Sequence, residues 1–211
     1  MVLLTRELEM VHSEIMTCTK CELHKSRTIA VPGEGPDNAR VLFIGEGPGE
    51  NEDREGRPFV GAAGKLLTEL LESIGVKRPE VFITNIVKCR PPNNRPPRQS
   101  EIDACNPYLQ DQARLISPRV ICPLGSPAVK TVLGPEYSAT GVHGKPFRKG
   151  GTVILPLYHP AAALYDPSLR QLMFQDIRVL KDLLDGRIPE NRIPAMRPEQ
   201  DTDDRSLHTW L

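Results

Sequence analysis

The sequence lacks three features that would place the protein in a familiar class. It has no uncharged apolar run of the roughly 18 residues that a transmembrane helix needs. It has no apolar signal core at its start, because Arg6, Glu7 and Glu9 stand where that core would be. Excess charge is also absent, since 27 Lys and Arg residues balance 27 Asp and Glu residues. We therefore expect a cytoplasmic protein without a membrane anchor, whose surface is not basic throughout but can hold a local basic groove.

A disulfide framework is not expected either. The five cysteines are odd in number, and we expect no signal peptide before them. Four form two pairs: Cys18 with Cys21 at the end of the first expected helix, and Cys89 with Cys105 across a gap of 15 residues. Such pairs suit either a tetrahedral zinc ion or an iron–sulfur cluster, the wide gap slightly favouring the cluster; free buried thiols are the alternative. Cys122 lies in an apolar run and is expected in the core.

What the sequence does contain is an alternation of strand and helix patterns, in a length of 211 residues that suffices for one full domain. Continuous apolar runs predict buried strands at residues 41–44, 81–86, 120–124 and 153–157. Spacings of three and four predict helices at residues 61–74, 100–116, 126–133 and 167–184. Ser100 is expected to cap the second of these helices. The alternation predicts an α/β domain with a mainly parallel sheet. We place it at residues 1–186 and expect a loosely packed or disordered tail at residues 187–211.

The unusual motifs stand where the predicted strands end. They are the glycine-rich turn at residues 45–49, Asn85 with the basic segment behind it, residues 123–125, and His159. Ligands of open α/β sheets bind outside the carboxyl ends of the strands. We therefore expect these four loops to converge on one site.

The glycine-rich turn does not match the known phosphate-binding loops. It lacks the Gly-Lys-Ser/Thr of a P-loop and the third glycine of a dinucleotide fingerprint. Its glycines would let the backbone approach a ligand closely. Glu46 directly follows the strand and is a candidate for water activation, whereas Glu50, Asp53 and Glu55 are expected in a solvated acidic loop. Phe59, just before a helix, suits either the core or a platform on which a base stacks.

The segment after the second strand is basic and rich in proline. It carries four cations and no acid, namely Lys88, Arg90, Arg95 and Arg98. An extended basic loop at this edge of a sheet favours contacts with a phosphate backbone, and a solvated loop is the alternative. Asn85 offers both a donor and an acceptor, as a nucleobase edge requires, although a structural role is equally compatible. His159 at the mouth of the sheet suits either a functional or a structural role.

Three segments and the early C-x-x-C resemble the family 4 uracil-DNA glycosylases, the iron–sulfur class of bacteria and archaea. The segments are GEGPGENEDREGRPFVGAAG, TNIVKCRPP and YHPAA, and the resemblance runs from about residue 18 to residue 184. It implies a three-layer α/β/α sandwich with a central four-stranded, mainly parallel sheet. It also implies a [4Fe-4S] cluster on Cys18, Cys21, Cys89 and Cys105.

The resemblance assigns roles around a uracil pocket. Gly45, Glu46 and Gly47 would line it and Phe59 would stack on the base. Asn85 would read the polar edge of uracil, and His159 would contact its O2 atom. Lys88, Arg90, Arg95 and Arg98 remain the expected contacts with the DNA backbone. From the chemistry, we expect the attacking water to be positioned by Glu46 or by the backbone near Gly47, and Glu52 is a second candidate for that role.

The implied activity is that of a monofunctional DNA-repair glycosylase, active as a monomer. It would flip uracil out of single- or double-stranded DNA and hydrolyse the N-glycosidic bond, leaving an abasic site. No histidine lies between Asn85 and Cys105, so we expect turnover rather than a covalent adduct. The cluster is expected to fasten the N-terminal segment to the basic loop. The alternatives are a non-catalytic iron–sulfur or zinc module that binds nucleic acid, and a glycosylase for another deaminated base such as hypoxanthine.

Overall fold

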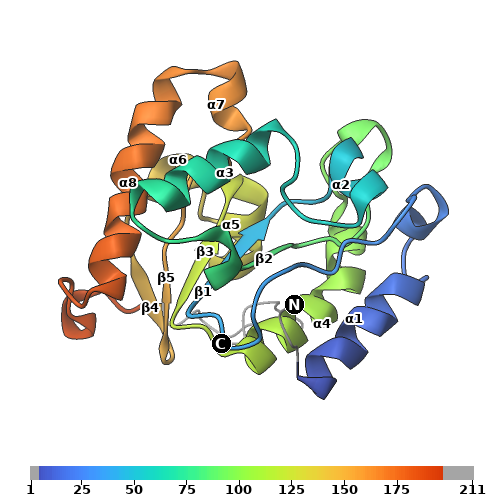
Figure 1. Cartoon of the computed structure of the whole chain (residues 1–211), viewed down its shortest axis with the longest axis horizontal. Coiled ribbons are helices and arrows are strands. Elements are labelled where there is room, and N and C mark those ends of the chain that lie inside the picture. Colours follow the sequence, from blue (N-terminus) through green and yellow to red (C-terminus); the bar gives the residue numbers. More distant parts are fainter. Residues whose placement is uncertain (1–4, 197–211) are drawn as a thin grey trace.

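The computed structural model describes residues 5–196, and its strands form one sheet in the order β2-β1-β3-β5-β4 (Figure 1). The strands are β1 (Val41–Gly45), β2 (Phe82–Asn85), β3 (Val120–Pro123), β4 (Phe147–Lys149) and β5 (Thr152–Ile154). The pairs β1·β2, β1·β3 and β3·β5 are parallel, and β4 is antiparallel to β5. The expected α/β class with a mainly parallel sheet is confirmed. The expected number of four strands is wrong, because the sheet has five.

The additional strand is β4, at the edge of the sheet. It has three residues, FRK, none of them buried, so it carries no apolar run. It is joined to β5 by Gly150 and Gly151, a two-glycine turn of the kind that connects hairpin strands. That turn is the signal from which this hairpin could have been predicted.

Helices cover both faces of the sheet (Figure 1). One face carries α1 (Arg6–Thr17), α4 (Gln99–Ile116) and α5 (Gly125–Leu133), and the other carries α3 (Ala62–Ser73) and α8 (Ser168–Leu184). Successive side chains of a strand point to opposite faces. Accordingly, Leu42 and Ile44 pack into the core on the α1 and α4 side, while Val41 and Phe43 pack into the core under α3 and α8. The expected three-layer sandwich is therefore present, and no helix among the described residues could span a membrane.

The expected helices are found, with shifts of a residue or so at their ends. The start of α4 differs from expectation: the N-cap is Arg98 rather than Ser100, because the carboxylate of Glu101 accepts a hydrogen bond from the Arg98 amide at 2.7 Å. Three short helices were not expected, namely α2 (Glu50–Glu55), α6 (Ala139–Val142) and α7 (Ala162–Tyr165).

The acids expected in a solvated loop lie in α2 instead. Asp53 is only 3% exposed, and its carboxylate accepts hydrogen bonds from the Thr28 amide at 2.9 and 3.1 Å. The expectation for Asp53 was therefore wrong, because it fastens α2 to the N-terminal segment.

The segment from residue 187 to residue 196 packs on the domain. The Arg148 amide donates to the Pro194 carbonyl and the Met196 amide donates to the Arg148 carbonyl, both at 2.9 Å. Ile193 is only 3% exposed. The expected boundary at residue 186 is therefore too early, and the rest of the expected tail lies outside the described residues.

Candidate active site

A cavity of about 290 Å³ opens at the carboxyl edge of the parallel strands. Its wall includes Glu46 and Gly47 after β1, Asn85 at the end of β2, Phe59 before α3, and His159 after β5. Three of the four loops expected to converge thus line one cavity. The fourth, after β3, lies behind His159, where a Cβ atom on Gly125 would be 2.9 Å from the His159 Cβ.

Gly45 and Asn85 are neighbours across the β1·β2 pair. A Cβ atom on Gly45 would lie 2.4 Å from Oδ1 of Asn85 and 2.7 Å from the ring of Phe59, so only glycine fits there. The Oδ1 atom of Asn85 is buried and accepts no hydrogen bond within the described part of the chain. Leaving a buried acceptor unpaired costs free energy. Because Asn85 is part of the cavity wall, a ligand bound in the cavity is the candidate for the missing donor.

The imidazole of His159 has one nitrogen already engaged. Its Nδ1 atom lies 3.1 Å from the Ala161 amide, which can only donate, so Nδ1 is the acceptor. Burial lowers the pKa of His159 to about 4, and the ring is therefore neutral at physiological pH. A neutral imidazole that accepts at Nδ1 carries its proton on Nε2. His159 therefore presents an uncharged N–H donor.

Phe59 forms another part of the wall. It is 7% exposed, and the centroid of its ring lies 5.4 Å from that of His159 with 32° between the planes. Its φ of +51° lies in the left-handed region, which is unusual for a bulky residue. An apolar ring is thus held next to the unpaired amide oxygen of Asn85 and the N–H donor of His159.

Two glutamates line the cavity and differ in their partners. Glu52 accepts hydrogen bonds from the Gly49 amide at 3.1 Å, the Val60 amide at 2.8 Å and the Gly61 amide at 2.9 Å. Its carboxylate is thus occupied in holding the backbone around the cavity. Glu46 is half-buried, its carboxylate has no hydrogen-bond partner among residues 5–196, and burial raises its pKa. Of the two glutamates, only Glu46 has both carboxylate oxygens without a hydrogen-bond partner in the described chain, so it is the better candidate to hold a water molecule.

Lys88 does not lie where a DNA contact would require. It is 1% exposed, and its ammonium group donates to Thr84 Oγ1, the Asn85 carbonyl and Gln112 Oε1 at 2.6 to 2.8 Å. Burial lowers its pKa to about 8. The expectation that Lys88 contacts phosphate is therefore wrong, because the side chain turns inward beneath the end of β2. The sequence shows the charge but not this direction.

The three arginines of the basic loop have different surroundings. Arg95 lines the cavity and binds the buried carboxylate of Glu101 through two nitrogens, at 2.6 and 2.9 Å. Arg90 donates to Asn94 at 2.8 Å and lies 3.5 Å from Glu50. Arg98 is exposed, and its side chain forms no hydrogen bond or ion pair within the described residues. The loop also adds side chains to the cavity wall that sequence reasoning did not assign: Pro91, Asn94 and Pro97.

The four paired cysteines line a second, smaller cavity between α1, α4 and the segment after β2. None is in a disulfide. N–H groups lie near three of the sulfurs: Arg27 Nη1 is 3.1 Å from Cys89, the Lys88 amide 3.3 Å from Cys105, and the Lys20 amide 3.5 Å from Cys18. No three His, Cys, Asp or Glu side chains in the described part of the chain form a group that could hold one metal ion. Cys122 is fully buried in the core, as expected.

Comparison with known proteins gives a consistent result. The sequence model of the Uracil DNA glycosylase superfamily matches residues 32–181. The chain is 49% identical over 185 residues to the Type-4 uracil-DNA glycosylase of Sulfurisphaera tokodaii, covering 83% of this chain and 84% of that protein. It is 46% identical over 186 residues to the Type-4 uracil-DNA glycosylase of Thermotoga maritima, covering 85% and 97%. The corresponding protein of Archaeoglobus fulgidus is 45% identical over 190 residues, covering 86% and 96%.

Proposed function

Since the chain belongs to the uracil-DNA glycosylase superfamily and to its type-4 members, we propose that it excises uracil from DNA by hydrolysing the N-glycosidic bond. The reaction releases free uracil and leaves an abasic site for repair. The observation that carries the proposal is the buried, unpaired Oδ1 atom of Asn85, a residue that lines the cavity together with an aromatic ring and a neutral imidazole.

The three side chains suit the polar edge and the flat face of uracil. Uracil presents an N3–H donor beside the O4 acceptor. The Asn85 amide can accept from N3–H at Oδ1 and donate to O4 through its NH₂ group. Cytosine presents the opposite pattern at the same positions, an acceptor at N3 and a donor at N4. Stacking on Phe59 contributes roughly 1–3 kcal/mol whatever the base, so Asn85 supplies the discrimination.

The chemistry needs stabilisation of negative charge on the leaving base. When the bond between C1′ and N1 breaks, its electron pair passes to uracil and spreads onto O2. The Nε2–H group of His159 donates a hydrogen bond toward O2, and it does so without giving up its proton. Water attacks C1′ on the sugar. The free carboxylate of Glu46 orients that water and accepts a proton from it.

We propose that Cys18, Cys21, Cys89 and Cys105 bind a [4Fe-4S] cluster. Four free thiols around one cavity suit it, and N–H groups beside three of the sulfurs stabilise thiolate charge. A single zinc ion would need all four sulfurs about 2.3 Å from one point, whereas a four-iron cluster binds each cysteine through a different iron. When bound, the cluster supplies a rigid cross-link between α1, α4 and the segment after β2.

The DNA partner would lie across the rim of the active-site cavity. Arg98 follows Pro97 of the cavity wall, is exposed, and forms no side-chain hydrogen bond or ion pair among the described residues. Large apolar side chains are exposed on α7, just after His159: Leu164 is 53% exposed and Tyr165 is 90% exposed. DNA-binding proteins insert such apolar side chains between base steps and unstack them, and extrusion of a base also requires unstacking. The cavity and the cysteine site are each lined by residues of a single chain, which supports a monomer. A role in DNA repair would place that monomer on the cell's own DNA, in the cytoplasm.

The test uses single- and double-stranded oligonucleotides that carry one uracil, with matched strands that carry cytosine, thymine or hypoxanthine. After incubation and alkaline treatment, we expect cleavage at the uracil alone, with release of free uracil and no protein–DNA adduct on a denaturing gel. Tight binding with an intact strand would instead favour a non-catalytic module. Preferential cleavage at hypoxanthine would assign a different base.

A further inference from the structure

Phe59 is held in a backbone conformation that it would not adopt by itself. Its φ of +51° places it with Asn93, Asn94 and Ser117 as the non-glycine residues of positive φ within the described chain. Asparagine tolerates this region, because its short polar side chain can bond locally, but a phenylalanine does not. Such a conformation persists only where surrounding contacts impose it. These contacts must therefore be found around the residue.

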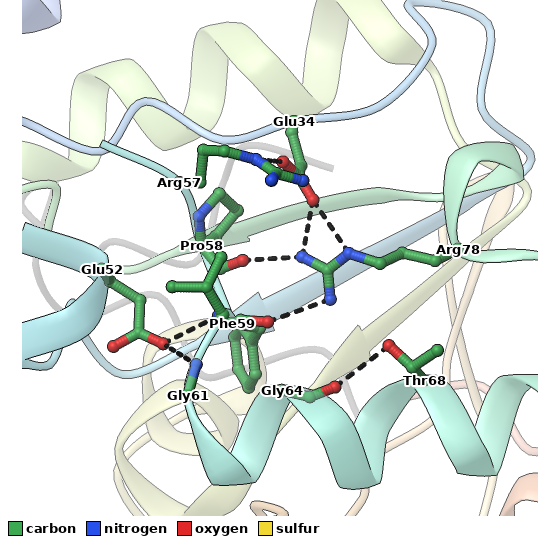
Figure 2. Close-up of polar contacts among 10 residues, drawn as sticks. Glu34, Glu52, Arg57, Pro58, Phe59, Gly61, Gly64, Thr68 and Arg78 are labelled. Atoms are coloured by element: carbon green, nitrogen blue, oxygen red, sulfur yellow. Dashed lines mark hydrogen bonds and ion pairs between the residues drawn. The ribbon is translucent and has the colours of Figure 1, made fainter. Parts of the chain in front are cut away.

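The guanidinium of Arg78 donates hydrogen bonds to the backbone carbonyls on both sides of the Phe59 Cα atom (Figure 2). Its Nη2 atom donates to the Pro58 carbonyl at 2.6 Å and its Nη1 atom donates to the Phe59 carbonyl at 3.1 Å. The first carbonyl belongs to the peptide plane before the Phe59 Cα atom, and the second belongs to the plane after it. One rigid planar group thus constrains both backbone dihedral angles of Phe59.

Glu34 fixes Arg78 in turn. Its Oε1 atom accepts from Arg78 Nε at 2.9 Å and from Nη2 at 2.6 Å, and both side chains are largely shielded, at 17% and 25% exposure. The backbone of Glu34 is itself paired with Ile83 of β2, through hydrogen bonds of 2.8 and 3.0 Å. Arg78, which binds the backbone of Phe59, is therefore fixed to the central sheet through Glu34.

The opposite side of the same segment is also held. The Phe59–Val60 peptide donates its N–H to Glu52 at 2.8 Å while its carbonyl accepts from Arg78 (Figure 2). Helix α3 closes the remaining space, since a Cβ atom on Gly64 would lie 1.8 Å from the Phe59 carbonyl oxygen. The backbone from which the Phe59 ring projects can therefore leave this conformation only if one of these contacts is lost.

We infer that Arg78, fixed by Glu34, is a positioning residue that holds the Phe59 ring in the orientation in which it stacks on the extruded base. The inference rests on the proposed function and adds to it a residue that does not line the uracil cavity. Of residues 57–61, Phe59 is the one that lines the uracil cavity. The effect of Arg78 on uracil should therefore pass through the Phe59 ring.

Arg57 provides the matched control. It pairs with the same carboxylate, donating from Nε to Glu34 Oε2 at 2.8 Å, but it makes no contact with the carbonyls of residues 58 and 59. Arg57→Ala and Arg78→Ala therefore each remove one cation from Glu34. Only the second releases the backbone of Phe59.

The experiment measures the inhibition constant of free uracil, kcat and KM on a single-stranded uracil oligonucleotide, and the thermal midpoint. We expect Arg78→Ala to weaken uracil inhibition about tenfold, and Arg57→Ala to change it by less than about twofold. In a Phe59→Ala background, Arg78→Ala should have no further effect on uracil inhibition. Arg78→Lys keeps the charge but can reach only one carbonyl at a time, so it should give an intermediate loss even if Arg78→Ala does not fold.

Two results would overturn the inference. One is an equal loss from Arg78→Ala with and without the Phe59 ring, and the other is unchanged uracil inhibition in Arg78→Lys. Either result, obtained while the wild-type protein still excises uracil, leaves the proposed function standing. A wild-type protein that excises no uracil overturns the proposed function together with this inference.

Discussion

At the scale of single residues, what the cavity can bind depends on which of its hydrogen-bonding atoms already have a partner in the protein. His159 has its Nδ1 atom engaged by Ala161, and Glu52 has its oxygens engaged by three amides. Asn85 Oδ1 and the Glu46 carboxylate have no partner in the described chain. The hydrogen bonds of the occupied atoms fix the orientation of the side chains around the cavity. The atoms without a partner are those that can form hydrogen bonds with a base and a water molecule.

The donor role of His159 leads to the first prediction. His159→Ala should lower the rate of excision by about 10²- to 10³-fold, because one donor to developing charge is lost. Affinity for the uracil oligonucleotide should stay nearly unchanged, since the phosphate contacts remain. Single-turnover kinetics and a binding titration measure the two quantities. An equal loss in both would show that His159 acts in binding.

The pH dependence of stability and of the excision rate tests whether His159 is neutral in the folded protein. Its folded pKa of about 4 lies below the ordinary value of 6.5, so the unfolded chain takes up its proton first as the pH falls. His159 therefore weakens the fold progressively between pH 6.5 and pH 4, and His159→Ala should lose less stability across this interval. A step in the excision rate near pH 6.5 that disappears in His159→Ala would contradict a neutral imidazole.

A second prediction concerns the close approach at Gly45. Gly45→Ala should abolish tight binding of uracil, because the added methyl group would displace both the Asn85 amide and the Phe59 ring. Gly151→Ala is the control, since a Cβ atom there meets nothing within 4 Å. The inhibition constant of free uracil is the measurement. Similar constants for the two variants would remove Gly45 from the site.

Several of these residues could be recognised in the sequence because of where they stand. Asn85 stands near the end of one predicted strand and His159 stands just beyond the end of another, and position alone marked them as candidates. Lys88 stands in an equally prominent place, yet its side chain packs inward against Thr84 and Gln112. Nothing in the spacing of residues reports that direction, since it depends on how α4 packs against the sheet.

At the scale of elements, the basic loop divides into a part that stabilises the fold and a part that faces outward. Arg95 neutralises Glu101, which is 3% exposed and also caps α4. The hydrogen bonds from Arg95 hold the pKa of Glu101 below its ordinary value. Arg98 makes no such internal contact within the described residues.

The third prediction separates these two parts. Arg98→Ala should lower DNA affinity, and should reduce the slope of log affinity against log salt by about 1, with little effect on unfolding. Arg95→Ala should lower the free energy of unfolding, because a buried carboxylate loses its partner. Salt-dependent binding titrations and urea unfolding measure these effects. The assignment fails if Arg98→Ala leaves the salt slope unchanged.

Elements differ in how far the sequence reveals them. The strands of the central sheet and the long helices have apolar patterns that burial imposes, and they lie close to their expected positions. The hairpin strand β4 has no buried residue, and α2 is so acidic that it reads as a solvated loop. Both depend on contacts with distant segments, such as the bonds from Thr28 to Asp53.

At the scale of the whole molecule, the two cavities are connected through the end of β2. Asn85 lies in the wall of one cavity, while Cys89 and the Lys88 amide lie at the other. The ammonium group of Lys88 binds the Asn85 carbonyl between them. Rigidity at the cysteine cavity should therefore support the position of the basic loop and of Asn85.

The fourth prediction tests the cysteine cavity. Cys89→Ala should lose iron and visible absorbance and should lower the thermal midpoint and DNA affinity, because the cross-link between α1 and the basic loop is lost. Cys122→Ala, which removes a buried thiol outside the cavity, should retain the iron. Iron retained in Cys89→Ala, with unchanged stability and affinity, would refute the assignment.

The meeting of the strand ends at one site could be expected from the topology of open parallel sheets, without reference to side chains. The support behind Phe59 could not. Glu34 and Arg78 are 44 residues apart, and neither stands next to a strand end that would single it out. Ion pairs of this kind depend on the tertiary structure, which charge patterns along the chain do not report.

A crystal structure of the protein with free uracil bound tests most directly whether the cavity is the uracil-binding site. We predict that the base lies on the Phe59 ring, with its N3–H group donating to Asn85 Oδ1 and its O2 atom accepting from His159 Nε2. The Asn85 oxygen would then be paired, and its unpaired state in the free protein would be explained. Uracil bound elsewhere, or in the cavity with the Asn85 oxygen still unpaired, would contradict this placement of the reaction.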